Sequence, residues 1–278
     1  MSKVWFVTGA NSGIGAGIAK AALKAGDRVV ATGRNLDKLR AAFDGVAGER
    51  LALVQLDVTD ETKAQAAVAE AIERFGRIDV LVNNAGYSLL GNFEELTVAD
   101  FEGMLATNFY GVLKVMRAAL PVMRKQRSGH VINISSVAGV AAFKHCSAYS
   151  ASKFAVEGMS LAVAAEVEQF GIKLTVVEPG FFRTSLLDHN NARYAESTIT
   201  DYASEGSARD MWSAYHGKQQ GDPDKLGATL VRITRMENPP KIFAAGSDAV
   251  QAITPAVEER LKSLRDNASL SGSTDGVA

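Results

Sequence analysis

Short apolar runs rich in β-branched residues recur along the chain, and a turn or a longer mixed segment follows each of them. Runs that are apolar without alternation are typical of strands buried on both faces of a sheet. We therefore expect seven strands, at Val4–Val7, Arg28–Thr32, Leu51–Leu56, Asp79–Val82, His130–Ile134, Lys173–Val177 and Lys241–Ala245.

The longer segments between these runs have the apolar periodicity of helices. The clearest are Gly15–Ala25, Thr62–Phe75, Val98–Arg124 and Ser152–Phe170. Strands that alternate with helices need right-handed crossovers, which predicts a doubly wound α/β fold in three layers, with helices on both faces of a parallel seven-stranded sheet. Ligands of such folds bind beyond the carboxyl ends of the strands, near the switch in strand order.

We expect a single domain over residues 1–250, because 278 residues that are 47% hydrophobic can bury one substantial core. Within it, residues from about 183 to 222 break the strand–helix rhythm and are expected to form a helical substrate lid. The alternative is a surface insertion whose aromatic side chains complete the core. In residues 251–278 we expect a polar helix at Thr254–Arg265 and a loose tail at Asn267–Ala278.

Charge and cysteine content narrow the function classes. The net charge is −1 and the basic residues are scattered, so neither nucleic acid nor an anionic membrane is an expected partner. No apolar run approaches the ~20 residues of a membrane span. Cys146 is the only cysteine, and no His/Cys cluster has the spacing of a zinc site, so we expect no metal and a cytoplasmic location.

A glycine-rich segment, Thr8–Gly15, joins the first expected strand to the first expected helix. Its glycines allow a tight turn close to a pyrophosphate, and the free N–H groups of the helix start favour an anion. The alternative is a turn that only packs helix on strand, but strand, spacing and helix agree with a nucleotide site. The expected binding residues are Gly9, Asn11, Ser12, Gly13, Ile14 and Gly15.

The end of the second strand decides the choice of cofactor. A site specific for NAD usually has an acid here for the ribose hydroxyl, whereas this chain has Gly33-Arg34-Asn35. Arg34 offers a charge-assisted fork to the extra phosphate of NADP, with Ser12 and Asn35 as helpers. We therefore expect NADP(H), although a solvated surface arginine is the alternative.

Two further strand ends suit the same ligand. Asp57, followed by Val58, ends the third strand and can reach the adenine amino group, while Asn84-Ala85-Gly86 follows the fourth strand beside the switch point. Their small residues admit a flat cofactor. Each is equally consistent with an ordinary strand-terminating turn.

The candidate reacting groups are Tyr149 and Lys153, which a spacing of four places on one helical face. A neighbouring ammonium lowers the pKa of a phenol, so Tyr149 can exchange a proton with a carbonyl oxygen as hydride reaches the carbon. Ser136, at the end of the fifth strand, can hydrogen-bond that oxygen, with Ser135 as the competing candidate. Asn108 is an amide within a helix, where it holds a relay water or is an ordinary polar residue.

Taken together, these motifs resemble the short-chain dehydrogenase/reductase family, over Lys3 to about Gly246. The matching features are Thr8-Gly9-x-x-x-Gly13-x-Gly15, Asn83-Asn84-Ala85-Gly86, Asn108, Ser136, Tyr149-x-x-x-Lys153 and Pro179-Gly180 followed by Thr184. The resemblance implies a Rossmann fold and a catalytic tetrad of Asn108, Ser136, Tyr149 and Lys153. It favours Ser136 over Ser135, and it implies that Lys153 binds the nicotinamide ribose while Phe182 and Thr184 hold the carboxamide.

The resulting expectation is an oxidoreductase that moves hydride between NADP(H) and a ketone or secondary alcohol. A nucleotide-binding sensor or scaffold without catalysis is the alternative. Aromatic and aliphatic residues predict an apolar or aromatic substrate: Phe143, Phe181, Phe182, Leu186, Leu187, Tyr194, Trp212 and Tyr215. By analogy with the family we expect a homodimer or homotetramer formed through Val98–Arg124 and Ser152–Phe170.

Overall fold

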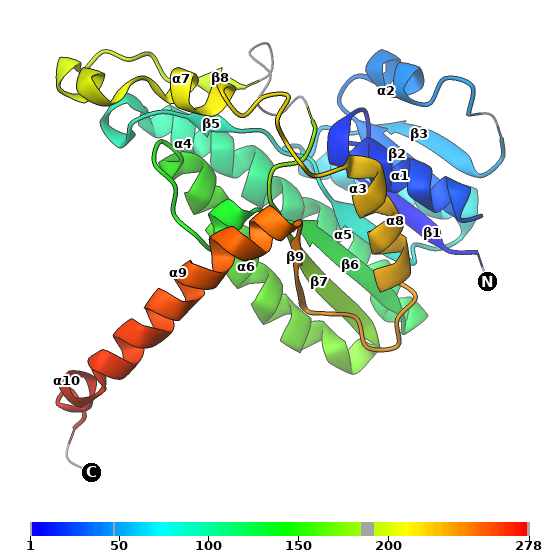
Figure 1. Cartoon of the computed structure of the whole chain (residues 1–278). Coiled ribbons are helices and arrows are strands. Elements are labelled where there is room, and N and C mark those ends of the chain that lie inside the picture. Colours follow the sequence, from blue (N-terminus) through cyan, green and yellow to red (C-terminus); the bar gives the residue numbers. More distant parts are fainter. Residues whose placement is uncertain (1, 47, 185–191, 277–278) are drawn as a thin grey trace.

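A parallel sheet of seven strands forms the centre of the computed structural model, which describes residues 2–46, 48–184 and 192–276 (Figure 1). The predicted doubly wound sheet is confirmed. Its spatial order is β3-β2-β1-β4-β6-β7-β9. The strands are β1 (Val4–Val7), β2 (Arg28–Gly33), β3 (Leu51–Gln55), β4 (Val80–Asn83), β6 (Gly129–Ile134), β7 (Ile172–Pro179) and β9 (Ile242–Ala245).

The strand order reverses between β1 and β4. From β1 the chain builds outward through β2 to the edge strand β3, and it then returns to β4, which pairs with the other side of β1 in the register Trp5↔Val80. The crossovers on the two sides of this switch point diverge to opposite faces, which leaves a crevice at the carboxyl ends of β1 and β4. The two predicted nucleotide-binding segments directly follow Val7 and Asn83, so both begin at this crevice.

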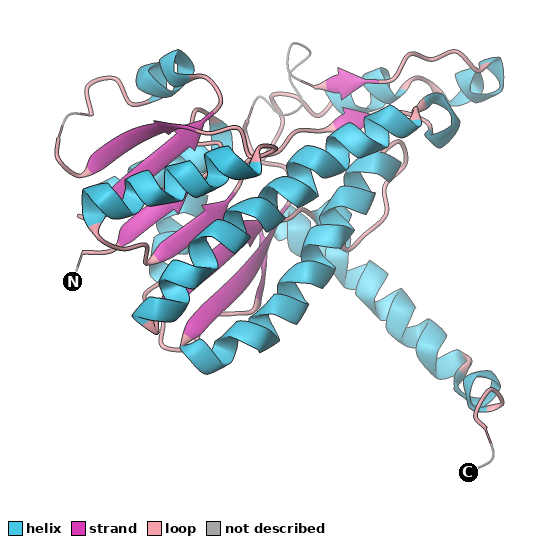
Figure 2. Ribbon diagram, turned by 180° about the vertical axis from the view of Figure 1, so that it is seen from behind, coloured by secondary structure: helices cyan, strands magenta, loops and turns pink. Residues whose placement is uncertain are grey.

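Helices cover both faces because successive strand residues point to opposite sides. In β1, Phe6 packs toward the helices α3 (Glu61–Phe75), α5 (Gly111–Gln126) and α6 (Ser147–Val167), onto which Figure 2 looks. Trp5 and Val7 pack toward the helices of the other face, α1 (Gly13–Lys24), α2 (Leu36–Ala42) and α8 (Pro223–Ile233). The result is the expected three-layer arrangement.

The predicted helix Val98–Arg124 is helical in the structure but is not a uniform α-helix. It consists of α4 (Val98–Leu105), a π-helical segment η2 (Ala106–Tyr110) and α5. Single π-helical turns insert an extra residue and are frequent at functional sites. Here the inserted turn contains Asn108, whose side chain bonds to a neighbouring loop.

The segment predicted as a helical lid has mixed structure where it is described. A strand β8 (Arg193–Tyr194) pairs with β5 (Leu89–Leu90), and η6 (Thr200–Glu205) and α7 (Ala208–Ser213) follow. Trp212 is buried against Phe143 and Phe181, so these rings also complete a small apolar core, as the alternative interpretation required. Leu186 and Leu187 lie outside the described residues.

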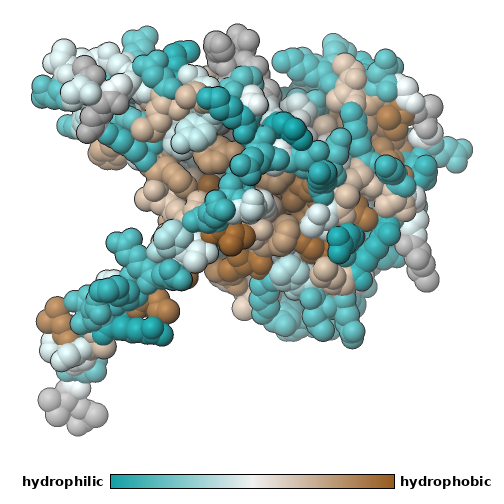
Figure 3. All heavy atoms as spheres, viewed as in Figure 1, coloured by the Kyte–Doolittle hydropathy of each residue, from teal (hydrophilic) through white to brown (hydrophobic). Residues whose placement is uncertain are grey.

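The C-terminal prediction is wrong in its boundaries. The helix α9 (Ser247–Asp266) begins seven residues before the expected Thr254, and the expected loose tail contains a short helix, α10 (Ala268–Gly272). Pro255 lies inside α9, which points away from the sheet (Figure 1). Figure 3 shows apolar side chains gathered where α9 leaves the body, and Ile242 and Val250 are exposed there.

No helix among the described residues is both long enough and apolar enough to cross a membrane.

Candidate active site

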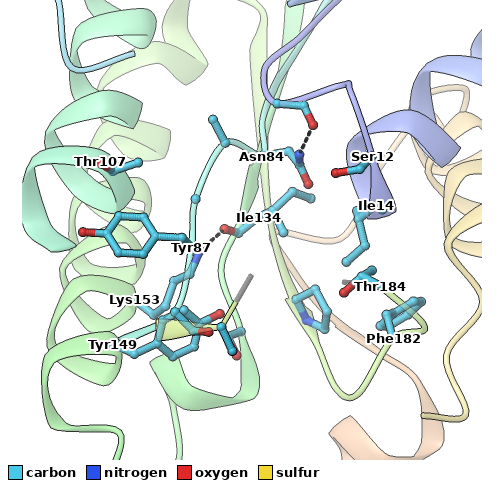
Figure 4. Close-up of a pocket in the computed structure, with 18 of the residues that line it drawn as sticks. Ser12, Ile14, Asn84, Tyr87, Thr107, Ile134, Tyr149, Lys153, Phe182 and Thr184 are labelled. Carbon is cyan, nitrogen blue, oxygen red and sulfur yellow. Dashed lines mark hydrogen bonds between the residues drawn. The ribbon is translucent and has the colours of Figure 1, made fainter. Parts of the chain in front are cut away.

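A cavity of about 810 Å³ opens at the carboxyl edge of the sheet and collects most of the predicted site residues. Those that line it are Gly9, Asn11, Ser12, Gly13, Ile14, Arg34, Asn35, Asp57, Val58, Asn84, Ala85, Gly86, Ser136, Tyr149, Lys153, Pro179, Gly180, Phe182 and Thr184. Gly15 and Asn108 are not among the lining residues. In Figure 4 the Tyr149 and Lys153 side chains face Ser12, Ile14, Phe182 and Thr184 across the cavity.

The glycine-rich loop is tied to the end of β4 by Thr8 and Asn84. The Thr8 hydroxyl accepts hydrogen bonds from the Asn84 N–H (2.9 Å) and the Ala85 N–H (3.0 Å), and Asn84 Nδ2 donates to the carbonyl oxygens of Thr8 (3.0 Å) and Gly9 (3.2 Å). At the start of α1, the N-cap Ser12 makes no capping hydrogen bond through its side chain. This helix start therefore faces the cavity with N–H groups and a positive dipole end, as a phosphate requires.

Gly15 lies just behind this cradle, where helix and loop are in close contact. A Cβ atom on Gly15 would lie 2.4 Å from the Gly9 carbonyl oxygen and from Asn84 Nδ2. Its part in the predicted site is thus to let α1 approach the loop. This is the packing role of the third glycine in such a turn.

Replacing Gly15 by Ala should lower the free energy of unfolding by about 2 kcal/mol, because the added methyl group has no room. The matched control is Gly158→Ala on α6, where a Cβ would meet nothing within 4 Å. That change should instead raise the free energy of unfolding by roughly 0.5–1 kcal/mol, because Ala favours a helix. Urea denaturation of both variants measures the difference, and equal stabilities would contradict the close packing at Gly15.

The end of β2 gathers positive charge at the edge of the cavity. Arg34 lines it, and so does Lys38 from the first turn of α2. The Asn35 side-chain oxygen accepts from the Lys38 N–H (2.9 Å) and caps α2, so only its amide NH₂ remains to help bind a phosphate. Lys38 was missed by the sequence reasoning, although its position four residues after Arg34 was a visible signal.

Asp57 follows β3 and lines the cavity on the same side. Its Oδ1 accepts from the Thr59 N–H (3.0 Å) and the Thr59 hydroxyl (2.7 Å). Burial acts to raise the pKa of Asp57, but these bonds and the charge of Arg34 outweigh it and hold the pKa below its usual value. Asp57 is therefore an anionic acceptor at the cavity, as contact with an amino group requires.

Three of the four predicted catalytic side chains converge at the wall formed by β6 and α6. The ammonium of Lys153 donates to the Ile134 carbonyl oxygen at 2.9 Å and lies 5.7 Å from the centre of the Tyr149 ring (Figure 4). Burial lowers the pKa of Lys153 to about 8. Burial raises the pKa of Tyr149 to about 12, against the opposing effect of its hydrogen bond with Ser136.

Burial has the largest effect on the pKa of Tyr149 in this structure, and the effect of Lys153 on it stays a prediction. In this structure the ammonium is directed at the end of β6, and the removal of water around the phenol dominates. Tyr149 therefore keeps its proton at neutral pH. A protonated phenol is the form that can donate to a developing alkoxide.

Asn108 is buried beneath the cavity wall. Its Oδ1 accepts from the Tyr87 N–H (3.1 Å), and its Nδ2 donates to the Tyr87 carbonyl oxygen (3.0 Å) and to the Ser152 hydroxyl (3.1 Å). The amide thus fixes the loop that follows β4, and through it the position of Tyr87, a lining residue that the sequence reasoning missed. The relay role of Asn108 stays a prediction.

Aromatic side chains form the wall beyond Tyr149. Phe143, Phe181 and Trp212 line the cavity, and the Trp212 ring lies edge-on to Phe143 at 6.3 Å. Cys146 also lines it. Tyr215 is not a lining residue, because its ring stacks on Phe181 at 5.0 Å and is about half exposed.

Comparison with known proteins agrees with this fold. The model of the short chain dehydrogenase family matches residues 3–195. The chain belongs to the short-chain dehydrogenases. It is therefore an oxidoreductase of this family.

Individual relatives cover nearly the whole chain. A short-chain dehydrogenase from Streptomyces avermitilis has a crystal structure with a TM-score of 0.90 and 37% identity, over 99% of both chains. The NADP-bound structure of ElxO has a TM-score of 0.75 and 30% identity, over 90% of this chain and 100% of that one. A 3-ketodihydrosphingosine reductase from Bacteroides thetaiotaomicron is 37% identical over 243 residues, 86% of each chain.

In this short-chain dehydrogenase the turn after β7 is held by a residue from α9 that sequence reasoning missed. Asp248 Oδ2 accepts from the Phe181 N–H at 2.7 Å, and a Cβ atom on Gly180 would lie 2.4 Å from Asp248 Oδ1. The turn thereby directs Phe181 and Phe182 into the cavity wall. No local signal marked Asp248, because it lies 67 residues away along the chain.

Proposed function

We propose that this short-chain dehydrogenase reduces apolar ketones to secondary alcohols with NADPH, and that the reverse oxidation uses the same groups. One observation carries the proposal: Ser136, Tyr149 and Lys153 meet at one end of a cavity whose other end has Arg34 and Lys38. A proton donor and a phosphate-binding pair are thus placed along a single elongated site.

The residues present fit a dinucleotide. A side chain at position 9, 13 or 15 would collide with neighbouring atoms. Glycine at these positions therefore lets the loop fold tightly and approach a pyrophosphate. Arg34 and Lys38 would hold a 2′-phosphate, and Asp57 would face the adenine amino group. Bound NADPH supplies the hydride. The NADP found in the ElxO structure supports this choice for a chain of the same fold.

The chain's own groups handle the carbonyl oxygen and its proton. The Ser136 hydroxyl donates a hydrogen bond to the oxygen and stabilises the negative charge that develops as the carbon accepts hydride. The Tyr149 phenol gives its proton to the same oxygen, which completes the alcohol and leaves a phenolate. The Lys153 ammonium stabilises that phenolate until it regains a proton from solvent.

The substrate end of the cavity favours an aryl or alkyl ketone, because Phe143, Phe181 and Trp212 form its wall. The name of the relative 3-ketodihydrosphingosine reductase describes the reduction of a keto compound, which supports carbonyl reduction as the reaction. Cytoplasmic location and a homodimeric or homotetrameric state remain parts of the proposal.

Replacing Phe143 by Ala should raise KM for an aryl ketone about tenfold while leaving kcat within about threefold, because one ring contact is worth roughly 0.5–1.5 kcal/mol. KM for a three-carbon ketone should change little. The matched control, Phe93→Ala, removes a ring that is 68% exposed and does not line the cavity. Equal KM changes for large and small ketones would exclude Phe143 from the substrate wall.

NADPH consumption, followed across a panel of carbonyl compounds and paired with a fluorescence titration of NADPH, tests the function as a whole. An enzyme binds NADPH and oxidises it in the presence of at least one ketone. A sensor or scaffold, the second candidate, binds NADPH and oxidises none with any compound. Binding of NADH with equal affinity would overturn the choice of cofactor.

A further inference from the structure

The C-terminal helix α9 has apolar side chains that are exposed to solvent. Of its 20 residues only Ala249 is buried, and every residue from Val257 to Gly276 is exposed. Both views of the fold show α9 leaving the sheet and pointing away from it (Figure 1, Figure 2). Most of the stability of a helix in a protein comes from packing of its apolar face, because an isolated helix is only marginally stable in water. The exposed face of α9 therefore needs a physical explanation.

The exposed apolar residues of α9 form one stripe. Val250, Val257, Leu261 and Leu264 are 52%, 51%, 44% and 65% exposed. With Thr254 they are spaced by four, three, four and three residues, which places them on one face over a length of about 21 Å. The Thr254 hydroxyl donates to the Val250 carbonyl oxygen at 2.8 Å, so its polar group is satisfied within the helix. Alternate spacings of four and three are the pattern by which helices pack on each other in a coiled coil.

Charged residues beside the stripe fit a second copy of the same helix. Glu258 directly follows Val257, and Arg265 directly follows Leu264, so both charges lie on the same flank of the stripe. Among the residues that the structure describes, neither takes part in an ion pair. An antiparallel pair of these helices brings the same flank of each copy together, so opposite charges can meet across it.

The apolar and the charged contacts agree on one antiparallel register. Where Leu261 of one copy faces Leu264 of the other, the two-fold axis passes midway between these two positions. The midpoint of Glu258 and Arg265 lies one residue away, which is about 1.5 Å along the helix. Each Glu258 thus meets Arg265 of the second copy, and symmetry makes the contact twice. A parallel pair would set Arg260 of one copy beside Arg265 of the other, which are like charges.

The same charges disfavour a membrane as the partner of the stripe. Helices that lie on membranes have a polar face rich in Lys and Arg. The polar residues in the outer half of α9 have both signs: Glu258, Glu259, Arg260, Lys262, Arg265 and Asp266. This mixture suits a partner that also has both signs, as a second copy does.

We propose that the stripe of Val250, Thr254, Val257, Leu261 and Leu264 is an interface on which a second copy of this chain packs its own α9 in the antiparallel direction. This surface is separate from α5 and α6, through which the family resemblance predicts oligomers. The inference goes beyond the proposed reaction, because none of the stripe residues lines the cavity. The stripe is short for an interface, so association is expected at micromolar concentrations.

Leu261→Glu places a charge in the middle of the stripe and should lower the mass of the assembly to about half or less, as measured by sedimentation velocity at about 1–100 µM protein. A point substitution is preferable to removal of α9, because Asp248 in its first turn accepts from the Phe181 N–H of the cavity wall at 2.7 Å. The matched control, Ser263→Glu, adds the same charge outside the stripe and should leave the mass unchanged. Circular dichroism shows whether each variant folds.

Charge reversal tests whether the two copies meet through the same flank. Glu258→Arg and Arg265→Glu should each weaken association about tenfold, because each replaces two attractive pairs by two repulsive ones. Glu258→Arg combined with Arg265→Glu should restore association, because the pairs form again with exchanged signs. These variants carry the test if Leu261→Glu does not fold. Stronger association of Arg265→Glu alone would indicate a parallel pair and would overturn the antiparallel arrangement.

Three further results would overturn the proposal. The first is a wild-type protein that stays at 29.5 kDa up to about 100 µM. The second is an assembly whose mass is unchanged in Leu261→Glu, because the copies would then meet through another surface, such as α5 and α6. The third is sedimentation of the wild type, but not of Leu261→Glu, with vesicles of phosphatidylcholine and phosphatidylglycerol, which would identify the stripe as a membrane contact.

Discussion

Tyr149→Phe should lower kcat for ketone reduction by about 10³-fold and leave the affinity for NADPH within a few-fold of the wild type. The substitution removes a single hydroxyl group, the phenol that lines the cavity together with Ser136 and Lys153. Positioned proton transfer contributes about 10²–10⁴ to rates of this kind. The ring, and with it the shape of the wall, remains.

Stopped-flow or steady-state NADPH oxidation gives kcat, and fluorescence titration gives the affinity. Tyr110→Phe is the matched control, because Tyr110 is 48% exposed and does not line the cavity. Its kinetics should equal those of the wild type. Turnover by Tyr149→Phe at close to the wild-type rate would remove Tyr149 from the chemistry and would return attention to Ser136.

Arg34→Asp should reduce the ratio of kcat/KM with NADPH to kcat/KM with NADH by about 10²–10³. A charge-assisted hydrogen bond to the 2′-phosphate is worth roughly 1.5–3 kcal/mol, and the new carboxylate adds repulsion of about 1 kcal/mol. The same carboxylate can accept a hydrogen bond from the ribose hydroxyl of NADH. The substitution therefore weakens the binding of NADPH and strengthens the binding of NADH. The ratio is obtained by measuring kcat/KM with each of the two cofactors over the same series of ketone concentrations.

Arg40→Asp controls for the change in overall charge. Arg40 lies on α2 close to Arg34, but it pairs with Asp37 at 3.0 Å and is absent from the cavity wall. The cofactor ratio of Arg40→Asp should stay within about threefold of the wild type, since exposed ion pairs contribute little. A ratio that is unchanged in Arg34→Asp would show that the phosphate is held elsewhere, with Lys38 as the next candidate.

Local sequence patterns were enough to predict a feature of the site where a single segment both forms a helix or strand and places its end at the cavity. The loop from Thr8 to Gly15 is such a segment, because a strand end, close-fitting glycines and a helix start follow each other directly. Arg34 and Asp57 follow the ends of neighbouring parallel strands, so strand order alone brings them to one edge. The spacing of four between Tyr149 and Lys153 likewise implies one helical face.

Contacts between distant segments account for what the sequence did not reveal. The helix α9 begins before Thr254 and contains Pro255, and the role of Asp248 depends on a bond to Phe181. The direction of the pKa shift of Tyr149 follows from burial, which no local pattern reports. Asn108 was recognised by its motif, yet only the folded chain shows that its amide binds Tyr87.

The sequence by itself determined the alternating fold, the glycine-rich loop and the identity of Ser136, Tyr149 and Lys153, since each depends on residues within one or two neighbouring elements. The tertiary structure decided which groups surround them. The pKa shifts of Tyr149 and Lys153, for example, follow from their burial, because the packing of several elements around an ionisable group removes water and disfavours its charged form.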